Sequence, residues 1–395
     1  MNEKKIIISR TVWVLCFVSL FTDIASEMLY PVMPVYLRSI GFSALVIGVL
    51  EGIAEATAGF SKGYFGDLSD KLNKRAPFVQ AGYGLSALSK PLLALLTYPL
   101  WIVFVRSLDR LGKGIRTSSR DAILSHESTI ETKTRVFGLH RGMDTLGAVI
   151  GPVFAVVYLN FYPGHYTEMF LIAFFPGIAS IALSFLIKDK KYDIVTGKER
   201  TGFFTFLKYW KVSGTDYRRL VTGLIVFAVL NSSDMFLLLI IKQKGFSDSS
   251  VIISYIFYNC VFAAASYPAG MLADKIGLKK SFIMGLLIFS AVYGMIAFAQ
   301  NIYFIFILFF LYGIYAAANE SIAKAWITNI TPKEQTATAI GFYSGINSIA
   351  AMCASFTAGF LWSVISPSAP FIFTSAGTLI LIIYFILFIR YRLKI

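Results

Sequence analysis

Paired carboxylates interrupt two apolar stretches near the start of this 395-residue chain. Asp23 and Glu27 are spaced i, i+4, which places both side chains on one face of a helix, and Glu51 and Glu55 repeat that spacing. A charged group at membrane depth costs roughly 2.5–3.5 kcal/mol on insertion scales, so it needs a partner or a function. These four acids are therefore candidates for proton transfer or substrate binding.

Basic residues accompany the acids, and the first half of the chain holds most of both. The remaining ionisable residues at membrane depth there are Lys90, Arg106, Asp109, Arg110, Lys113, His140, Arg141 and Asp144; the second half has Asp234, Glu320 and Lys324. An acid that faces an arginine in a dry cavity can exchange its proton for substrate. The alternative is that these charges pair with one another and only hold helices together.

Neutral polar and aromatic residues take the corresponding places in the second half. They are Asn231, Tyr255, Tyr258, Asn259, Tyr312, Tyr315, Asn319, Tyr343 and Asn347. A tyrosine ring can pack against a ligand while its hydroxyl group forms a hydrogen bond with it. Enrichment of tyrosine at the membrane interface is the alternative, and it suits outer positions such as Tyr303.

The elements that must position these residues are apolar helices. The chain is 56% hydrophobic and 15% charged, against about 25% charged in globular proteins, so it lacks the polar surface of a soluble fold. A spanning helix needs about 20 mostly apolar residues. Twelve segments qualify: 11–37, 44–68, 77–97, 100–122, 135–158, 166–187, 219–241, 248–273, 280–299, 302–328, 335–363 and 369–389. Runs such as 302–311 do not alternate, which excludes a membrane barrel.

Lysine and arginine lie mainly in the loops on one side, and only Arg38, Lys242 and Lys244 lie in the loops on the other. The positive-inside rule then predicts that both termini are cytoplasmic. This bias accounts for most of the formal net charge of +14 without nucleic acid as a partner. The three cysteines lie in apolar segments without ligand spacing, so we expect neither disulfides nor a metal site.

The chain repeats itself at an offset of 204 residues. Gly66-Asp67-Leu68-Ser69-Asp70-Lys71 recurs as Gly270-Met271-Leu272-Ala273-Asp274-Lys275, and Gly41-Phe42-Ser43 recurs as Gly245-Phe246-Ser247. We therefore predict an N-terminal six-helix bundle at 1–187, a cytoplasmic linker at 188–218 and a C-terminal six-helix bundle at 219–395. Parallel repeats of this kind are typical of transporters with a binding site near the membrane midplane.

Both copies of the repeated motif resemble the loop signature of the major facilitator superfamily. The first copy continues to Arg75 and has Asn73 where the family has a second glycine; the second copy keeps that glycine as Gly277. The resemblance implies that Asp70 and Asp274 pair across to a neighbouring helix end and that Gly66 and Gly270 allow close approach. It also implies that the cations, Lys71, Arg75 and Lys275, bind the acidic membrane face and helix C-termini. Alternatively, the cations only determine topology.

The family's helices 1, 4, 7 and 10 line its central cavity. By resemblance, the candidates for the cavity and for proton coupling are Asp23, Glu27, Arg106, Asp109, Arg110 and Lys113. The lower-ranked cavity set is Glu51, Glu55, Lys90, Arg141, Asp144, Asn231, Asp234, Tyr255, Asn259, Tyr312, Tyr315 and Asn319.

The fifth segment carries Gly147-x-x-x-Gly151-Pro152, which resembles the signature of the drug–proton antiporters, with Ala155 and Val156 in place of the trailing glycines. Ordinary close helix packing is the alternative, because small residues at i, i+4 are common in membranes.

These features predict a secondary active transporter in the inner, cytoplasmic membrane that works by alternating access. Proton-coupled antiport and export of an anionic or zwitterionic organic solute is favoured, because the basic residues in the first half exceed what Asp109 and Asp144 can neutralise. A multidrug exporter of neutral or cationic compounds, or a symporter or facilitator for uptake, remains open. A membrane receptor or embedded enzyme is the alternative outside transport. Substrate, protons and lipid are the expected partners of a monomer without cofactor.

Overall fold

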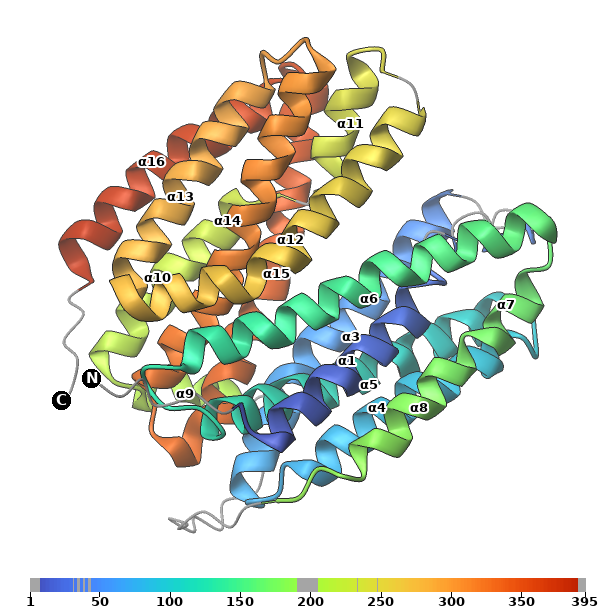
Figure 1. Ribbon diagram of the computed structural model, residues 1–395, viewed down its shortest axis with the longest axis horizontal. Helices are drawn as coiled ribbons and strands as arrows, with labels where there is room; N and C mark the ends of the chain where they lie inside the picture. The colour runs from blue at the N-terminus through green and yellow to red at the C-terminus, as the bar shows by residue number, and fades with distance from the viewer. Residues whose placement is uncertain are drawn as a thin grey trace.

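The computed structural model describes residues 8–30, 32–33, 36–37, 40–41, 44–189, 205–232, 234–246 and 248–389, and within these ranges the regular structure is helical (Figure 1). The first group of helices is α1 (Arg10–Glu27), α3 (Ala44–Lys71), α4 (Ala76–Leu93), α5 (Pro99–His126), α6 (Lys133–Phe161), α7 (Tyr166–Ile172) and α8 (Phe174–Ser184). The second group is α10 (Thr215–Leu230), α11 (Met235–Gln243), α12 (Asp248–Ile276), α13 (Leu278–Ile296), α14 (Ile302–Asn329), α15 (Thr336–Val364) and α16 (Ala369–Phe388). Short helices precede the second group and follow α14: η1 (Thr205–Lys208), α9 (Tyr209–Val212) and η2 (Lys333–Gln335).

Local sequence explains several helix ends. The Ser9 hydroxyl oxygen accepts a hydrogen bond from Val12 N at 3.3 Å at the start of α1, and Asn301 caps α14 by accepting one from Tyr303 N at 2.8 Å. Between α12 and α13 the chain turns at Gly277 with φ +95°. The equivalent residue between α3 and α4 is Asn73, with φ +48°. Asparagine tolerates the left-handed region better than most residues, which explains how the first copy dispenses with the family's glycine.

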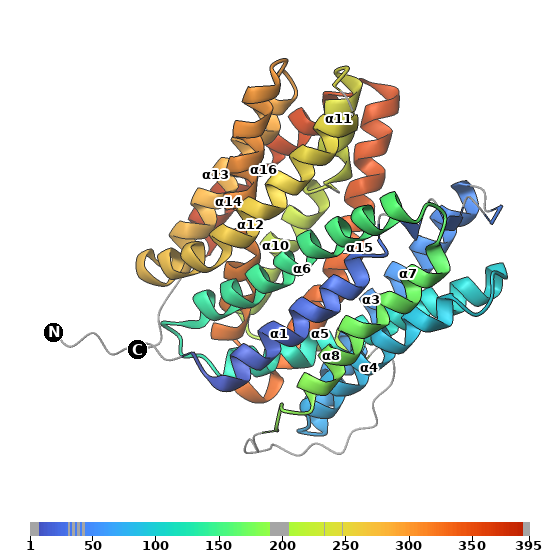
Figure 2. The ribbon, with the colours of Figure 1, turned by 45° about the vertical axis from the view of Figure 1, so that its right-hand side comes forward.

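The two groups form two bundles, the N-half and the C-half, which meet along two lines of contact. Helix α3 packs against α15, and α6 packs against α12; we call these the α3/α15 seam and the α6/α12 seam. The bundles meet near the end that carries α9, which we call the α9 end, and diverge toward the end that carries α7 and α11 (Figures 1 and 2). The polar contacts that join the described parts of the two halves lie at the α9 end of the molecule and near the middle of the helices.

The predicted segments correspond to these helices with one to four residues of difference at most ends, and with three interruptions. The first segment was expected to run to residue 37, but α1 ends at Glu27. Helices α7 and α8 divide the sixth segment, and residues 231–234 divide the seventh into α10 and α11. In the described residues, seven helices are long and apolar enough to cross a membrane. Helices α1, α3 and α5 are outside that set and carry several of the charged residues singled out above, whereas Arg141 and Asp144 lie on α6 and Glu320 and Lys324 lie on α14, which belong to it.

The end of the linker contacts both halves. Residues 190–204 lie outside the described part of the chain, and η1 and α9 follow. The buried Phe206 ring lies against Gly63 of α3, where a Cβ atom would collide with it, and close to Gly345 of α15. Trp210 stacks on Phe342 of α15 at 5.7 Å. The linker segment therefore fills the α3/α15 seam.

Candidate functional site

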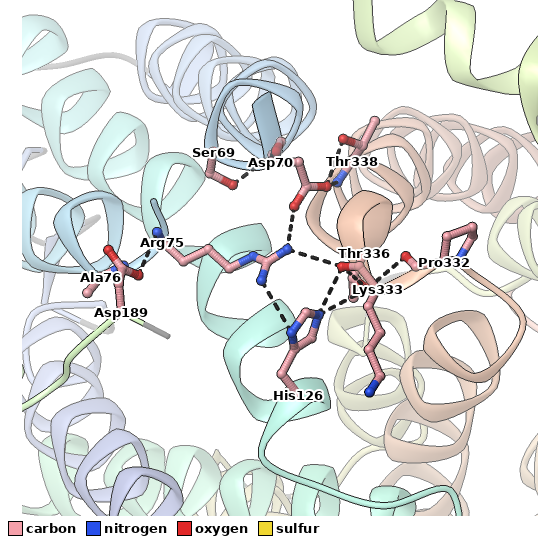
Figure 3. Close-up of polar contacts among 11 residues, drawn as sticks. Ser69, Asp70, Arg75, Ala76, His126, Asp189, Pro332, Lys333, Thr336 and Thr338 are labelled. Carbon is pink, nitrogen blue, oxygen red and sulfur yellow. Dashed lines mark hydrogen bonds and ion pairs between the residues drawn. The ribbon is translucent and has the colours of Figure 1, made fainter. Parts of the chain in front are cut away.

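The first copy of the repeated motif joins the two halves through Asp70, at the end of α3 (Figure 3). The Asp70 carboxylate accepts hydrogen bonds from Thr338 N at 2.7 Å and from the Thr338 hydroxyl at 2.9 Å, both at the start of α15. Arg75 of the same loop donates to Asp70 at 2.7 Å and to the Lys333 carbonyl at 3.2 Å. His126 also contacts that carbonyl, at 3.0 Å. We call this group the Asp70 lock.

The second copy makes the pseudosymmetric contact through Asp274, near the end of α12. Its carboxylate accepts hydrogen bonds from the backbone nitrogens of Thr134 and Arg135 at 3.1 Å each, and from Arg135 Nε at 3.0 Å. These donors lie at the start of α6, so the carboxylate caps the positive end of a helix dipole. We call this group the Asp274 lock.

Glycines bring the helices together beside each lock. A Cβ atom on Gly66 would lie 2.5 Å from the Ala337 carbonyl oxygen, and one on Gly270 would lie 2.7 Å from the Thr134 carbonyl oxygen. Lys71 forms an ion pair with Asp67 of its own helix at 2.8 Å, and Lys275 is exposed. Among the gating candidates, the two aspartates, the two glycines and Arg75 meet the opposite half, whereas Lys71 pairs within α3.

A cavity of about 570 Å³ lies between the two halves. Its charged lining residues from the N-half are Asp23, Glu27, Lys62, Lys113, Arg116, Arg120, Arg141 and Asp144. Those from the C-half are Asp234, Glu320 and Lys324, joined by the polar residues Asn231, Tyr255, Tyr258, Asn259, Tyr312, Tyr315, Asn319, Tyr343 and Asn347. The cavity thus has a charged N-half wall and a C-half wall rich in tyrosine and asparagine.

Asp144 is the centre of a network on the charged wall. It accepts hydrogen bonds from the Ser19 hydroxyl at 2.6 Å and from Arg141 at 2.6 Å, and the Asp23 carboxyl group is in hydrogen-bonding contact with it. Arg141 also forms an ion pair with Glu320 of α14 at 2.7 Å. A hydrogen bond between two carboxyl groups contains a proton, so the Asp23–Asp144 pair can hold one.

A second buried ion pair joins the halves below this network. Asp121 of α5 pairs with Arg120 at 3.0 Å and with Lys324 of α14 at 3.1 Å, and its side chain has no exposed area. The sequence analysis missed Arg116, Arg120, Asp121 and Lys62. The available signal was a helical stripe, because Lys113, Arg116, Thr117 and Arg120 repeat at three- and four-residue steps and all line the cavity.

Several predicted cavity residues do not line the cavity. Lys90 donates to Asp109 at 2.8 Å in a buried ion pair between α4 and α5, so this pair connects helices inside the N-half. Arg106 is buried in the same region and Arg110 is half-buried, and neither lines the cavity. Lys90 lies on α4 and the other three residues lie on α5, and these two helices pack against each other inside the N-half, so the part of these four residues in the cavity stays a prediction. The side chains of Glu51 and Glu55 lie outside the described part of the chain.

The glycines of the fifth segment pack α6 on α1. A Cβ atom on Gly147 would lie 2.7 Å from the Leu20 carbonyl oxygen, and one on Gly151 would lie 2.7 Å from Met28 N. Pro152 lies within α6. Their placement is that of close helix packing inside the N-half, and it also positions Asp144 of α6 next to α1.

The tyrosine-rich wall surrounds a carboxylate at the interruption between α10 and α11. Asp234 accepts a hydrogen bond from the Tyr312 hydroxyl at 2.6 Å. The ring of Tyr312 lies 5.1 Å from that of Tyr258 and 5.5 Å from that of Tyr315. In the described residues, no group of three or more His, Cys, Asp and Glu side chains could hold a metal ion.

Two pseudosymmetric locks, two bundles and a cavity between them are the arrangement that is typical of transporters working by alternating access. The family comparison agrees: the model of the Major Facilitator Superfamily matches residues 15–265 and 220–394. The chain therefore belongs to the Major Facilitator Superfamily and is a multi-pass membrane protein. Its family and fold are those of transporters, as the resemblance of the repeated motif predicted.

The chain is also similar to transporters and to a solved transporter structure. An uncharacterized MFS-type transporter of Methanocaldococcus jannaschii is 32% identical over 96% of this chain and 95% of its own. A homologue of the multi-drug resistance efflux pump PmrA from Lactococcus lactis is 22% identical over 97% of this chain and 95% of its own. The crystal structure of the human organic anion transporter MFSD10 aligns with a TM-score of 0.80 at 17% identity, covering 95% of this chain and 99% of that one. At that identity the likeness shows the fold alone.

Proposed function

We propose that this protein is a proton-coupled secondary transporter of the cytoplasmic membrane that exports a small organic solute with an acidic group, anionic or zwitterionic. The observation that carries the proposal is the pair Lys113 and Arg116 on the cavity wall. In the described residues neither forms an ion pair with a carboxylate; Arg116 donates to the Ser86 hydroxyl at 2.6 Å and lies 4.5 Å from the Tyr83 ring centroid. Such cations suit a carboxylate or phosphate group of a solute.

The carboxyl pair Asp23–Asp144 supports proton coupling. It lies on the cavity wall beside Arg141, which connects the N-half to Glu320 of the C-half. Protonation of the pair removes negative charge from the network that joins the halves, so proton uptake and the inter-half contact are linked. On the predicted topology the closed locks are cytoplasmic, and the described conformation is the one in which the cavity faces outward. The proposal divides the chain into an N-terminal bundle at 1–187, a linker at 188–218 and a C-terminal bundle at 219–395.

The experiment that tests anion recognition is a thermal-shift screen of the purified protein against small carboxylates, phosphates and amines. Binding to the native state raises the melting temperature as the ligand concentration exceeds the dissociation constant. We expect stabilisation by an acid, lost in Lys113→Ala and Arg116→Ala and kept in the control Lys211→Ala, which removes an exposed linker cation. Stabilisation by amines alone, unchanged in both variants, would contradict the proposal.

The experiment that tests coupling measures flux of the best acidic ligand in proteoliposomes with and without a pH gradient. We expect Asp23→Asn to remove the response to the gradient, and Asp216→Asn, at an exposed site of α10, to retain it. An undiminished response in Asp23→Asn and in Asp23→Asn/Glu27→Gln would exclude these carboxylates as the coupling site.

A multidrug exporter of neutral or cationic compounds is the second candidate. Two observations favour it: the aromatic C-half wall, and the names of the relatives from Lactococcus lactis and Streptococcus pneumoniae, which are multi-drug resistance efflux pumps at 22% and 20% identity. Its distinguishing result in the same screen is stabilisation by chemically diverse apolar compounds, without dependence on Lys113.

A further inference from the structure

Asp234 lies where the backbone of a membrane-spanning segment is interrupted. Helix α10 ends at Leu230, and its C-cap residue Asn231 has an extended conformation with φ −84° and ψ +93°. Helix α11 begins at Met235, with the Asp234 carbonyl accepting from Leu237 N at 3.0 Å. The C-terminal end of a helix carries partial negative charge, so the end of α10 favours a cation near this interruption.

The Asp234 carboxyl group forms no ion pair with a basic side chain in the described residues. Its partners are hydroxyl groups: Tyr312 donates at 2.6 Å, and Tyr258 also forms a hydrogen bond with it. Arg141, the basic residue that interacts with it through space, is held by Asp144 at 2.6 Å and by Glu320 at 2.7 Å. A carboxyl group on a cavity wall with neutral donors alone lacks a counter-ion, and a cationic ligand would supply one.

The surroundings of this carboxylate are aromatic. The rings of Tyr258, Tyr293 and Tyr315 lie 5.1, 6.1 and 5.5 Å from that of Tyr312. Aromatic faces attract organic cations within about 6 Å, and aromatic cages are the usual form of ammonium sites. The amide oxygen of Asn231 is buried without a hydrogen-bond partner and lacks a donor. A protonated amine would supply that donor, whereas a bare metal ion would need about six oxygen ligands.

We propose that Asp234, Asn231 and the tyrosines around them form a subsite for the protonated amine of the transported solute. The inference rests on the proposed function, since the subsite occupies the same cavity, and it deepens it. The acidic group of the solute lies against Lys113 and Arg116 of the N-half, and its amine lies against Asp234 of the C-half. The substrate class is then a zwitterion that contacts both halves, so its binding can favour a change in their relative position.

The test uses three probes that share a ring and differ in charge: benzylammonium, benzyl alcohol and benzoate. Dissociation constants are measured by calorimetry on the purified full-length protein in detergent. We expect benzylammonium to bind more tightly than benzyl alcohol, and Asp234→Asn to weaken benzylammonium by about tenfold or more through loss of a charged contact. Benzyl alcohol should bind Asp234→Asn and the native protein alike.

Two further variants keep the test decisive. Tyr312→Phe retains the ring and removes one donor to the carboxylate, so benzylammonium should still bind, within about threefold of the native protein. Asp216→Asn removes an exposed acid of α10 outside the cavity and should change nothing. If Asp234→Asn fails to fold, Asn231→Leu decides the matter: it removes the amide oxygen that is proposed to accept from the amine, so benzylammonium should lose its advantage over benzyl alcohol.

Equal affinity for benzylammonium and benzyl alcohol in the native protein would overturn the inference, and so would unchanged benzylammonium affinity in Asp234→Asn. Benzoate separates this result from the proposed function. Benzoate binding that depends on Lys113 but not on Asp234 would support the acidic pole alone. Charge discrimination at Asp234 without benzoate binding would support the amine subsite and refute the acidic pole.

Discussion

The α3/α15 seam and the α6/α12 seam are built from repeated sequence but hold the two halves together differently. Both place an aspartate on the first turn of a helix in the opposite half. At the α6/α12 seam the cation that neutralises Asp274 is Arg135 of the other half, so the ion pair itself crosses the seam. At the α3/α15 seam the cation is Arg75 of the same half, and it reaches across through the Lys333 carbonyl. Both seams therefore share an aspartate that caps a helix of the opposite half, but the arginine that pairs with this aspartate comes from the same half at one seam and from the opposite half at the other.

The seams also differ in how they are filled. At the α6/α12 seam, Gly138 packs directly against the Ser266 carbonyl of α12. At the α3/α15 seam, Gly63 faces the Phe206 ring of the linker. The residue of α12 that corresponds to Gly63 at the repeat offset is Tyr267. One seam thus carries its own aromatic residue at this position, and the other receives an aromatic ring from outside the repeat.

The largest effect is expected when both locks are removed together. Asp70→Asn/Asp274→Asn leaves no carboxylate on the first turn of α15 or of α6. The conformation in which the two halves are closed at the α9 end therefore loses stability. We expect the initial transport rate in proteoliposomes to fall about tenfold or more, while membrane insertion is retained. A rate equal to that of the native protein would show that the locks have no part in gating.

Filling the space opposite the linker should have the next largest effect. In Gly63→Ala the new Cβ atom collides with the Phe206 ring, and overpacking of this kind costs about 1–3 kcal/mol. We expect a lower melting temperature for Gly63→Ala in the native background, and no further loss when Gly63→Ala is added to Phe206→Ala, which has already removed the ring. Gly84→Ala is the control, because a Cβ atom there has no neighbour within 4 Å. An equal loss from Gly63→Ala in both backgrounds would mean that the linker does not fill this seam in solution.

The single variants Asp274→Asn and Asp70→Asn should differ in how far they open the cavity. Asp274→Asn removes an ion pair that crosses the seam, whereas Asp70→Asn removes an ion pair within the N-half. Asp274→Asn should therefore open the cavity more toward the α9 end of the molecule. The readout is the labelling rate of Ser344→Cys on the cavity wall, after Cys16, Cys260 and Cys353 are replaced by serine. We expect the labelling rate of Asp274→Asn to exceed that of Asp70→Asn about threefold, an estimate for one charge-assisted hydrogen bond. The reverse order would refute the distinction between the seams.

The smallest effect is expected at His126, which belongs only to the Asp70 lock. Its ring contacts the Lys333 carbonyl at 3.0 Å and Arg75 at 3.4 Å, in addition to the bonds that Asp70 makes itself. His126→Gln can keep one of these contacts, so transport should stay within about twofold of the native rate. A loss as large as that of Asp70→Asn would place the histidine at the centre of the lock.

Sequence alone located the helices and the locks, because both depend on local patterns. Length and apolarity specify a spanning segment, and the duplicated motif specified Asp70 and Asp274. The sequence alone could not specify which side of a helix faces the cavity, because the rotation of a helix about its axis is set by packing with neighbouring helices. For that reason Lys90 and Asp109 were predicted in the cavity but pair inside the N-half.

The missed residues have a similar origin. Arg120 and Asp121 lie among the last residues of the predicted segment 100–122, and Lys324, which pairs with Asp121, belongs to the other half of the chain. The interruption before Asp234 has no proline or glycine at the break, so tertiary contacts decide it. The α9 region was predicted as linker because it lies in the long hydrophilic stretch between the halves, and it folds because both halves offer it a surface.

The start of α4 has a consequence for how the protein is made. This helix has no capping side chain of its own, and its first backbone nitrogens, Arg75 N and Ala76 N, both donate to Asp189 at 2.8 Å. Asp189 follows Arg75 by 114 residues and lies at the start of the linker. During synthesis, α4 therefore enters the membrane long before its cap leaves the ribosome. The N-half becomes complete only when the chain reaches Asp189, and the order of translation makes that residue the closing step in assembly of the first bundle.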